Sequence, residues 1–562
     1  MKGESNMRIS KILALLLVIM VCLCGCLCGC DNGSNTEKPS SKVNDKSGSS
    51  ADAKKEESDE TEEEKPGKKV EITVGTMYDS FVTPDGSDPE DTDFVESGTS
   101  VSTLSTNWEG PHKMSGNSDT LASEYRNKVL SAKNTKDNYS WSGTTYYVSP
   151  SGNDKNDGKS PAKAVKTLDA DIFVMDVLKP GDAVLFERGG LWRMRHSIST
   201  ADGVTYGSYG SGEKPTFYGS AYNYADSSYW SHSRKQYVWK VSISDYDIGL
   251  AVFNHGEMTG IKKTTGLTSL GKNGDFYFNQ KEDLLYLYYD KGNPGECFKD
   301  IELGLRIAGF SVNSDDTVID NFRIKYFGAF GISLGGSNNS KITNCELGYI
   351  GGAMQNETVR YGNAIQHWNG GDGHLVENCW VYQIYDTGLT WQGNSYWNPG
   401  YKIRNDYNNF VYRNNLIEYC SMSFEFWHDT AETEDSSGAV INGFICEKNI
   451  SRFAGYGFGK QRPDPNGVHI KVGKRCFPQA VNNRISDNIF DLCSRFIVDW
   501  EFKKGQNNGI WDISNNTYYH GKNTKNEAIW FGNTNLGAEN QADLEYALNI
   551  FEKTPALIKW VG

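Results

Sequence analysis

The stretch from residue 318 onward repeats one short motif. Asn321-Phe322-Arg323-Ile324 is echoed by Asn344-Cys345-Glu346-Leu347 and Asn378-Cys379-Trp380-Val381, and again from Asn415, Asn449, Asn488 and Asn515. The separations between these asparagines are 23, 34, 37, 34, 39 and 27 residues. A minimum in the low twenties with a variable excess is typical of a solenoid whose turns carry loops of different length. Because asparagine tolerates a left-handed backbone and its amide can bond to the next turn, the repeat predicts a stacked corner between strands.

A second strand is expected after each corner. The segments are 331–334, 364–367, 388–391, 423–426, 457–460, 497–500 and 528–531. Period-two alternation directs Ile332, Ile365, Leu389, Phe424, Phe458, Val498 and Ile529 into the core. The outward residues then form one stripe, composed of Ser333, Gln366, Thr390, Glu425, Gly459, Asp499 and Trp530.

The segment that precedes this repeat carries a family resemblance. It contains Tyr147-Val148-Ser149-Pro150-Ser151-Gly152, Leu178-Lys179-Pro180-Gly181-Asp182 and Gly210-Ser211-Gly212-Glu213-Lys214-Pro215. These motifs resemble the entry segment of secreted right-handed parallel β-helix proteins of the pectate-lyase-like superfamily, and the resemblance covers residues 145–535. It implies an all-β solenoid, with the Trp- and Tyr-rich stretch 217–300 as a β-rich insertion. Members are mostly polysaccharide lyases and glycoside hydrolases, but adhesins share the fold, so the resemblance implies carbohydrate without deciding the reaction.

The N-terminal region predicts export. A basic start and an apolar run at 12–21 are typical of a signal peptide over residues 1–30. Cys26 and Cys30 each end a segment that resembles a bacterial lipobox, and either is a candidate for lipidation. Residues 31–69 are too polar to bury a core and predict a disordered tether. We therefore expect an extracytoplasmic protein anchored to the bacterial cell membrane by its N-terminal lipid alone.

The remaining boundaries follow from the same patterns. Residues 70–143 have no assigned fold, apart from a short helix expected at 121–130. Residues 144–562 form the expected β-helix, and helical spacing over 540–551 predicts a helix that caps its open end.

Composition restricts the partners. A formal net charge of −14 argues against nucleic acid as a ligand. The cysteines after the signal form no C-x-x-C pair, so neither zinc nor a disulfide framework is expected. The loop Asp154-x-Asn156-x-Gly158 is interpreted as a structural turn rather than a calcium site. No cofactor or metal is expected, except calcium if the protein is a lyase, and the protein is expected to be a monomer.

Two carboxylates of the stripe suggest chemistry. Glu425 and Asp499 lie two rungs apart, roughly 9.5 Å, with Gly459 between them as an open floor. That separation suits an inverting glycoside hydrolase, which places a water beside the anomeric carbon. Phe424, Phe426 and Trp427 would desolvate Glu425, which predicts Glu425 as the acid and Asp499 as the base. The competing interpretation is that both are ordinary solvated strand residues.

Other residues near the stripe are candidates for substrate binding. They are Trp427, His428, Asp429, Thr390, Gln366, Lys460, Arg462, Glu501 and Trp530. Exposed aromatic rings can stack on sugars, although each ring alone fits surface packing equally well. One alternative is a polysaccharide lyase acting on a uronate polymer, with Lys460, Arg462 or Lys471 as the base. The other is a non-catalytic glycan-binding or adhesive lipoprotein.

Overall fold

The computed structural model describes residues 69–70, 114–174, 177–398, 401–403, 405–430, 441–463, 467–473, 481–500, 511–523, 525–532 and 534–561. The chain divides into two units, Met1–Lys65 and Pro66–Gly562, and every described residue belongs to the second. The predicted signal peptide, Cys26, Cys30 and nearly all of the tether therefore lie outside the described residues. None of the described helices combines the length and the apolar character needed to cross a membrane.

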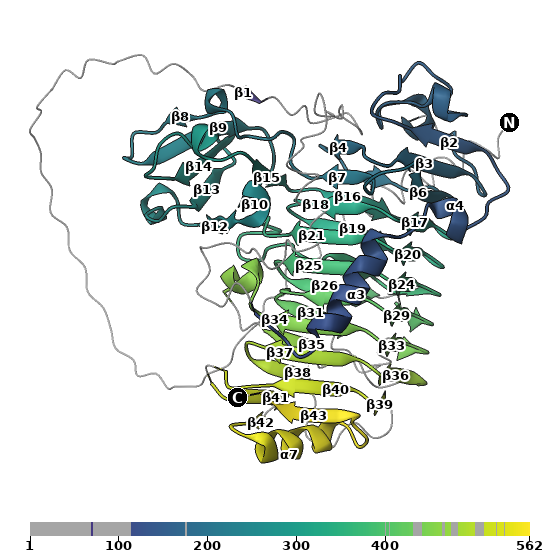
Figure 1. The fold of residues 1–562 in the computed structure, drawn as a ribbon, viewed down its shortest axis with the longest axis vertical. Coiled ribbons are helices and arrows are strands. Elements are labelled where there is room, and N and C mark those ends of the chain that lie inside the picture. The colour runs from purple at the N-terminus through teal and green to yellow at the C-terminus, as the bar shows by residue number, and fades with distance from the viewer. Residues whose placement is uncertain are drawn as a thin grey trace, which may run out of the picture. The chain divides into compact units, whose positions relative to one another are not determined.

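Three long parallel ladders dominate the fold (Figure 1). Sheet I carries the predicted stripe. Its strands, in ladder order, are β5 (Ile198–Ser199), β16 (Ala308–Val312), β19 (Phe330–Gly335), β22 (Ile365–Trp368), β26 (Thr387–Asn398), β31 (Met422–Thr430), β35 (Val468–Val472), β38 (Phe496–Trp500), β41 (Glu527–Phe531) and β42 (Thr534–Gly537). Only β42, with β27 (Tyr401–Ile403) beside β26, pairs antiparallel among these described strands.

Sheets II and III complete each turn of the coil. Sheet II contains β2 (Thr145–Val148), β3 (Ala183–Glu187), β6 (Thr205–Tyr209), β17 (Val318–Asp320), β20 (Lys341–Thr343), β24 (Leu375–Glu377), β29 (Val411–Arg413), β33 (Ile445–Glu447), β36 (Asn483–Ser486) and β39 (Trp511–Ser514). Sheet III contains β4 (Leu191–Arg193), β7 (Thr216–Tyr218), β18 (Arg323–Lys325), β21 (Glu346–Ile350), β25 (Trp380–Ile384), β30 (Leu416–Glu418), β34 (Ile450–Ala454), β37 (Ile489–Cys493), β40 (Thr517–His520) and β43 (Leu557–Trp560). The chain passes through sheets II, III and I in turn, as in β17, β18 and β19, which confirms the predicted parallel β-helix.

The core lies between the three ladders and consists of the residues that alternation directs inward. On sheet I, Ile332, Ile365, Leu389, Phe424, Val498 and Ile529 are all fully buried. These residues stack rung on rung, with Ile470 between Phe424 and Val498, so the core continues from turn to turn. Burial of such apolar surface in every turn is the main force that holds a solenoid together.

Two adjacent residues form the corner between sheets II and III in each turn. The repeat identified from the sequence includes asparagines from both positions. Asn321, Asn344 and Asn378 adopt the left-handed conformation, with φ between 53° and 72°. The strand register aligns them with Asn414, one residue before the predicted Asn415. The predicted register is therefore wrong by one residue between Asn378 and Asn415. Both positions favour asparagine, one for its backbone and the other for its amide.

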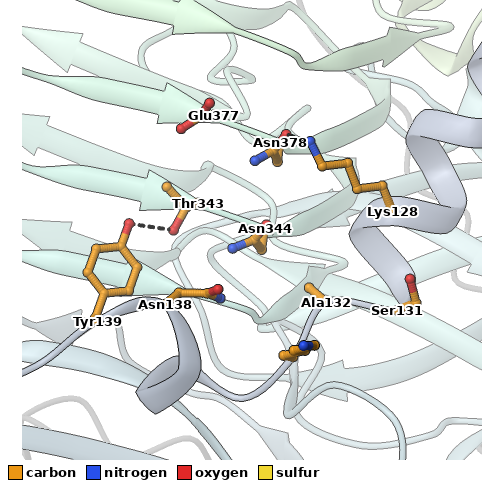
Figure 2. A pocket seen from close by; sticks show the side chains of 10 residues that line it. Lys128, Ser131, Ala132, Asn138, Tyr139, Thr343, Asn344, Glu377 and Asn378 are labelled. Carbon is orange, nitrogen blue, oxygen red and sulfur yellow. Dashed lines mark hydrogen bonds between the residues drawn. The ribbon is translucent and has the colours of Figure 1, made fainter.

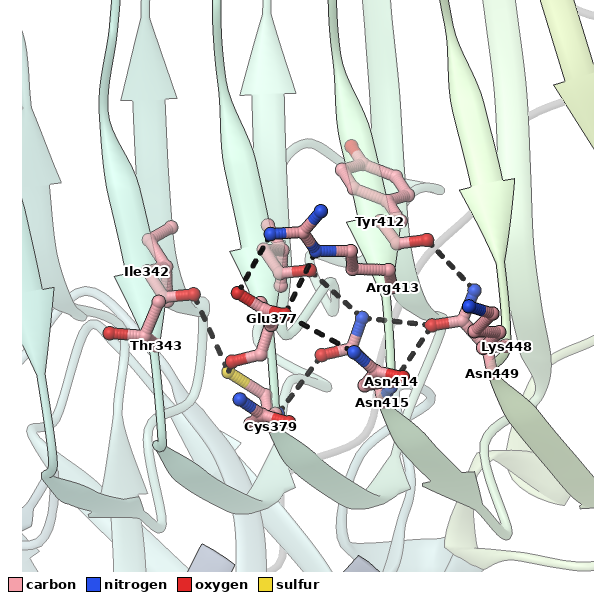
Figure 3. A network of polar contacts seen from close by, with 12 residues as sticks. Ile342, Thr343, Glu377, Cys379, Tyr412, Arg413, Asn414, Asn415, Lys448 and Asn449 are labelled. Atoms are coloured by element: carbon pink, nitrogen blue, oxygen red, sulfur yellow. Dashed lines mark hydrogen bonds and ion pairs between the residues drawn. The ribbon is translucent and has the colours of Figure 1, made fainter. Parts of the chain in front are cut away.

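The second position forms a ladder of buried amides (Figure 3). The side-chain oxygen of Asn449 accepts from the backbone and side-chain nitrogens of Asn415 at 3.0 and 2.9 Å. Asn488 and Asn516 repeat the pattern on the next two turns. At the last turn the carboxylate of Glu552 takes the place of the next asparagine and accepts both donors of Asn516 at 3.0 Å. The ladder therefore ends on a buried carboxyl group.

The insertion forms separate sheets. One contains β8 (Ser231–His232), β9 (Val238–Ile243), β12 (Ile261–Lys262), β13 (Asp275–Asn279) and β14 (Leu284–Tyr288), with β1 (Lys69–Val70) at its edge. The other contains β10 (Ile248–Phe253), β11 (Met258–Thr259) and β15 (Ile301–Leu305). A third small sheet, formed by β23 (Gly371–Asp372), β28 (Tyr407–Asn408) and β32 (Ile441–Asn442), belongs to the β-helix. The β-rich insertion expected near 217–300 is thus present.

The helices cover parts of the ladders. Helix α3 (Asp119–Leu130), expected at 121–130, lies across sheet III, where Arg126 pairs with Glu418 at 3.0 Å. Helix α7 (Gln541–Phe551) packs its buried face, which includes Leu544 and Phe551, against the last turn as the predicted cap. The short helices are α4 (Thr135–Asn138), α5 (Asp171–Val174), α6 (Pro294–Cys297), η2 (Pro161–Lys163), η3 (Ser227–Tyr229), η4 (Asn254–Gly256), η5 (Leu267–Ser269) and η6 (Phe458–Gln461).

His374 makes the stability of the fold depend on pH. It is 1% exposed, its Nε2 lies 2.7 Å from the Ser337 carbonyl, and its Nδ1 accepts from the Ser340 amide at 3.3 Å. Burial lowers the pKa of His374 from 6.5 to about 4. Between these pH values the unfolded chain binds the extra proton. The free energy of unfolding therefore decreases by on the order of 3 kcal/mol through this residue as the pH falls from 6.5 to 4.

We expect His374→Gln to unfold with a weaker acid dependence than the wild type over that range, measured as the free energy of unfolding in urea at several pH values. Exposed His232 supplies the control, because His232→Gln should leave the slope unchanged. Equal slopes for wild type and His374→Gln would contradict the assignment.

Candidate functional site

The outer face of sheet I aligns the stripe residues one rung after another. The register pairs Ser333 with Gln366, Gln366 with Thr390, Thr390 with Glu425, Glu425 with Lys471, Lys471 with Asp499, and Asp499 with Trp530. The structure therefore agrees with the expected stripe at every position but one, where Lys471 stands in place of Gly459.

Gly459 lies in a different element. It belongs to η6, which leaves the β-helix to contact the insertion: Gln461 Nε2 donates to the Gly260 carbonyl at 2.8 Å, and its Oε1 accepts from the Lys262 amide at 3.0 Å. The strand of this turn is β35, in which Lys471 takes the stripe position 12 residues after Gly459. Its Val-His-Ile-Lys-Val alternation is a strand pattern that was visible in the sequence, whereas a segment with glycine at every second position is a poor strand former.

The replacement removes the open floor expected between the two carboxylates. Glu425, Lys471 and Asp499 occupy three successive rungs, each about 4.8 Å from the next at the backbone. A cation between two anions stabilises the charged form of each neighbour, and the two anions stabilise the ammonium. The site is thus a row of two carboxyl groups with an amine between them.

Glu425 is held by two side-chain donors. Its Oε2 accepts from Gln392 Nε2 at 2.5 Å and from Thr387 Oγ1 at 3.2 Å, and the residue is 8% exposed. Phe424 and Phe426, which were expected to desolvate this carboxyl, are fully buried in the core on the other side of the strand. Because donors to a carboxylate favour its ionised form, this environment suits a base better than the predicted acid.

Asp499 lies in a different environment. It is half-buried, its Oδ1 is buried, and its neighbours along the stripe are Lys471 and the indole of Trp530. The Trp530 ring packs 6.2 Å from that of Phe496. Lys471 favours the charged form of this carboxyl group, whereas the indole and partial burial disfavour it. The two carboxyl groups of the row therefore lie in unlike environments.

The predicted binding residues on the N-terminal side of Glu425 serve mainly to hold the row. Thr390 is fully buried, and its hydroxyl donates to the Glu425 carbonyl at 2.7 Å. Gln366 is 7% exposed and accepts from Asn363 Nδ2 at 2.6 Å. Asn363, Thr387 and Gln392 were not predicted, because their role depends on pairing between turns that the sequence does not display.

Trp427 lies on the same face as Glu425, two residues along β31, and is half-buried. Its indole lies over Gly473, where a β-carbon would come within 2.6 Å of Trp427 Cδ1. Only glycine leaves room for the ring in this position. The backbone of His428 and Asp429 continues β31 beside β26, but their side chains and all of Glu501 lie outside the described part.

Two predicted basic residues lie away from the row. Lys460 is exposed at the end of η6, and Arg462 forms an ion pair with Asp386. Neither is on the stripe, whereas Lys471, also considered as a base, is at its centre. Within the described ranges, no cluster of three or more His, Cys, Asp or Glu residues could hold a metal ion.

A separate cavity of about 480 Å³ lies at the corner between sheets II and III (Figure 2). Its lining includes Lys128 from α3, Tyr139, and Thr343 and Glu377 from sheet II. The Tyr139 hydroxyl lies 2.9 Å from Thr343 Oγ1, and Glu377 pairs with Arg413 at 2.8 Å. No stripe residue lines this cavity, so it is not part of the row.

Of the comparisons with known proteins, only the comparison with solved structures found similar chains. No family model and no curated protein matches the chain. The family 28 exopolygalacturonase of Yersinia enterocolitica is 10% identical with a TM-score of 0.39, and 70% of each chain is covered. The GH136 lacto-N-biosidase of Eubacterium ramulus is 13% identical with a TM-score of 0.31, covering 79% of this chain and 68% of that one. A rhamnogalacturonan lyase is 12% identical with a TM-score of 0.35, covering 67% and 74%.

Similarity at this level carries no argument about the reaction. The fold itself is defined by the three parallel ladders, the amide ladder at one corner and the capping helix. With these features, the chain is a parallel β-helix.

Proposed function

We propose that this chain is a glycoside hydrolase that cleaves a polysaccharide or oligosaccharide bound along the stripe of sheet I. The row Glu425–Lys471–Asp499 carries the proposal. Its two acidic residues stand two rungs apart, roughly 9.5 Å at the backbone, at the upper end of the carboxyl separation of about 6.5–9.5 Å used by inverting enzymes.

The unlike environments of the two carboxyl groups assign their roles. Glu425, which accepts from Gln392 and Thr387, is the base, and Asp499, beside Trp530, is the acid. A water gives a proton to Glu425 while its oxygen attacks the anomeric carbon. The glycosidic bond to the leaving oxygen breaks, and that oxygen takes the proton of Asp499. This assignment reverses the roles expected from sequence.

Lys471 is proposed to hold the sugar rather than to abstract a proton. Two neighbouring acidic residues favour the protonated form of its amine, which makes Lys471 a weak base but a good donor to sugar hydroxyls. The same reasoning argues against the lyase alternative, which needs a neutral base beside a uronate carboxylate.

A panel of neutral and acidic polysaccharides tests the reaction. New reducing ends without ultraviolet absorbance of an unsaturated sugar are the expected result. Absorbance that rises with turnover and disappears in Lys471→Gln would overturn the hydrolase proposal in favour of a lyase. Glycan binding without either signal would favour an adhesive or binding protein.

Trp427 is proposed to stack on a sugar ring, and Gly473 allows it to do so. We expect Gly473→Ala to displace the indole and to raise KM by a few-fold to tenfold, since an aromatic contact contributes about 0.5–1.5 kcal/mol. Steady-state kinetics measures the effect. Gly271→Ala is the control, because a β-carbon at Gly271 would meet no atom within 4 Å. An unchanged KM in Gly473→Ala would argue against stacking.

We also propose that the protein works outside the cytoplasm, anchored by a lipid on Cys26 or Cys30. The apolar run and the two lipobox-like segments support this location. Incorporation of labelled fatty acid that persists when both cysteines are replaced by serine would contradict it.

A further inference from the structure

One side-chain hydroxyl lies between two carboxyl groups at the edge of the row. Thr387 Oγ1 is 3.2 Å from Glu425 Oε2 and 3.4 Å from Asp386 Oδ1. Thr387 is fully buried, and Glu425 is 8% exposed. Because a hydroxyl has a single proton, Thr387 can donate to only one of the two carboxyl groups at a time. Asp386 therefore competes with the proposed base for one of its donors.

Asp386 has a cation of its own. The guanidinium of Arg462 forms an ion pair with the Asp386 carboxylate, and the two side chains are 18% and 15% exposed. An opposite charge in contact with a carboxylate stabilises its ionised form and offsets its effect on other groups nearby. With Asp386 paired in this way, the Thr387 hydroxyl is left to donate to Glu425.

Contacts with the insertion bring Arg462 to this place. Arg462 directly follows η6, whose last residue, Gln461, donates from Nε2 to the Gly260 carbonyl at 2.8 Å. The Oε1 of Gln461 accepts from the Lys262 amide at 3.0 Å. Asp386 directly precedes β26, the strand beside that of the proposed base. The ion pair of Arg462 and Asp386 therefore connects the insertion with the edge of the proposed site.

The two carboxyl groups are close enough to affect each other's ionisation. Oxygens that share one hydroxyl lie within roughly 7 Å of each other. Interactions between buried or partly buried charges are screened much less than those at the surface. An uncompensated charge on Asp386 would therefore raise the pKa of Glu425, and loss of the Thr387 donor would raise it further.

The remaining groups around Glu425 do not depend on Arg462. Lys471 of β35 lies beside Glu425 on the same face, and Asp499 of β38 lies one rung beyond Lys471. Gln392 of β26 donates to Glu425 Oε2 at 2.5 Å. A variant of Arg462 leaves these neighbours in place, so its effect on Glu425 can be measured separately from theirs.

We propose that Arg462 is a positioning residue for the proposed base, Glu425. By pairing with Asp386, it leaves the Thr387 hydroxyl to the base and offsets a second negative charge beside it. The inference rests on the proposed function, in which Glu425 accepts the proton of the attacking water. It also gives the insertion a part in the reaction, since the contacts of Gln461 hold the guanidinium at the site.

Titration of the Glu425 carboxyl group in the full chain in detergent tests this role without a substrate. Glutamate labelled with ¹³C at the side-chain carboxyl is followed by NMR against pH, and loss of one signal in Glu425→Gln identifies the residue. Arg462→Gln should raise the pKa of Glu425 by about one unit. Arg462→Lys should lie closer to the wild type, because it keeps the cation. Combining Arg462→Gln with Asp386→Asn should return the pKa towards the wild-type value, because the competing charge is gone.

Arg495→Gln is the matched control. Arg495 also precedes a strand of sheet I and pairs with a carboxylate, that of Glu527 at 2.6 Å, and its side chain is 20% exposed. This pair lies on the turns beyond Lys471, so the titration of Glu425 should stay as in the wild type. An unchanged pKa in Arg462→Gln, an equal change in Arg495→Gln, or a change that persists in the double variant would overturn the proposal.

The pH dependence of kcat on a glycan that the panel shows to be cleaved gives a second readout. Since a base must be ionised, the acidic limb should move to higher pH in Arg462→Gln, with rates on its alkaline side close to the wild type. An equal loss at every pH would mean that the ion pair only supports the fold. If Glu425→Gln keeps its turnover, the assigned hydrolase site fails. If Glu425→Gln abolishes turnover while Arg462→Gln titrates as the wild type, the site stands and the role of Arg462 fails.

Discussion

Replacing Glu425 by glutamine is expected to lower the rate of hydrolysis by about 10²–10⁴-fold, the usual contribution of a general base or acid. The amide oxygen of glutamine can still accept from Gln392 and Thr387, so the fold of the site should persist. The loss should fall on kcat rather than KM, because the base acts in the transition state. Initial rates of reducing-end release measure it.

Asp499→Asn should cause a comparable loss, and the double variant should be little worse than either single one, since residues that act as a unit are not additive. Glu377→Gln, on sheet II and paired with Arg413, serves as the control and should keep full activity. A rate within tenfold of the wild type in both Glu425→Gln and Asp499→Asn would show that the row is not the catalytic site.

Replacing Glu552 by alanine is expected to unravel the C-terminal turns. This residue is 1% exposed, and its carboxylate accepts from the Asn516 amide, the Asn516 side chain and the Tyr518 hydroxyl, the last at 2.6 Å. Three buried donors would lose their acceptor, at a cost of about 3 kcal/mol or more. Because solenoid turns are stabilised by their neighbours, the loss should spread from the end. Hydrogen exchange of the amides in β40 and β43 should rise most.

Glu545→Ala is the matched control, since this glutamate lies on α7, the helix that Glu552 directly follows, but is exposed. It should leave hydrogen exchange in the last turns unchanged. Glu552→Gln should lie between, because one oxygen remains while the new amide group faces donors. Equal protection in Glu552→Ala and the wild type would contradict the proposed role of this carboxylate.

The sequence predicted the fold well because each turn repeats the same local requirements. A left-handed corner, a buried amide and an alternating strand recur from turn to turn, so an error at one position is outweighed by the others. The inward residues from Ile332 to Ile529 and the stripe residues from Ser333 to Trp530 agree with the structure wherever a true strand was chosen.

The errors occur where two local patterns compete. At the corner, adjacent positions both favour asparagine, so Asn378 and Asn415 were aligned one residue out of register. In the turn of Gly459, a loop that contains η6 contacts the insertion before the chain reaches strand β35. The sequence carries no local signal for the length of such a loop. That one displacement removed Lys471 from the predicted site and left an open floor in its place.

The sequence by itself determined the parallel β-helix, its core, the position of Glu425 and Asp499 on one face, and the capping helix, because these follow from periodicity and from corner residues. Only the tertiary structure decided what stands between and around the carboxylates. Lys471, Gln392 and Thr387 reach Glu425 from other turns, and Gln461 reaches Gly260 across the boundary of the insertion. Contacts of this kind depend on how turns stack, and residues far apart in the chain carry no local trace of the pairing.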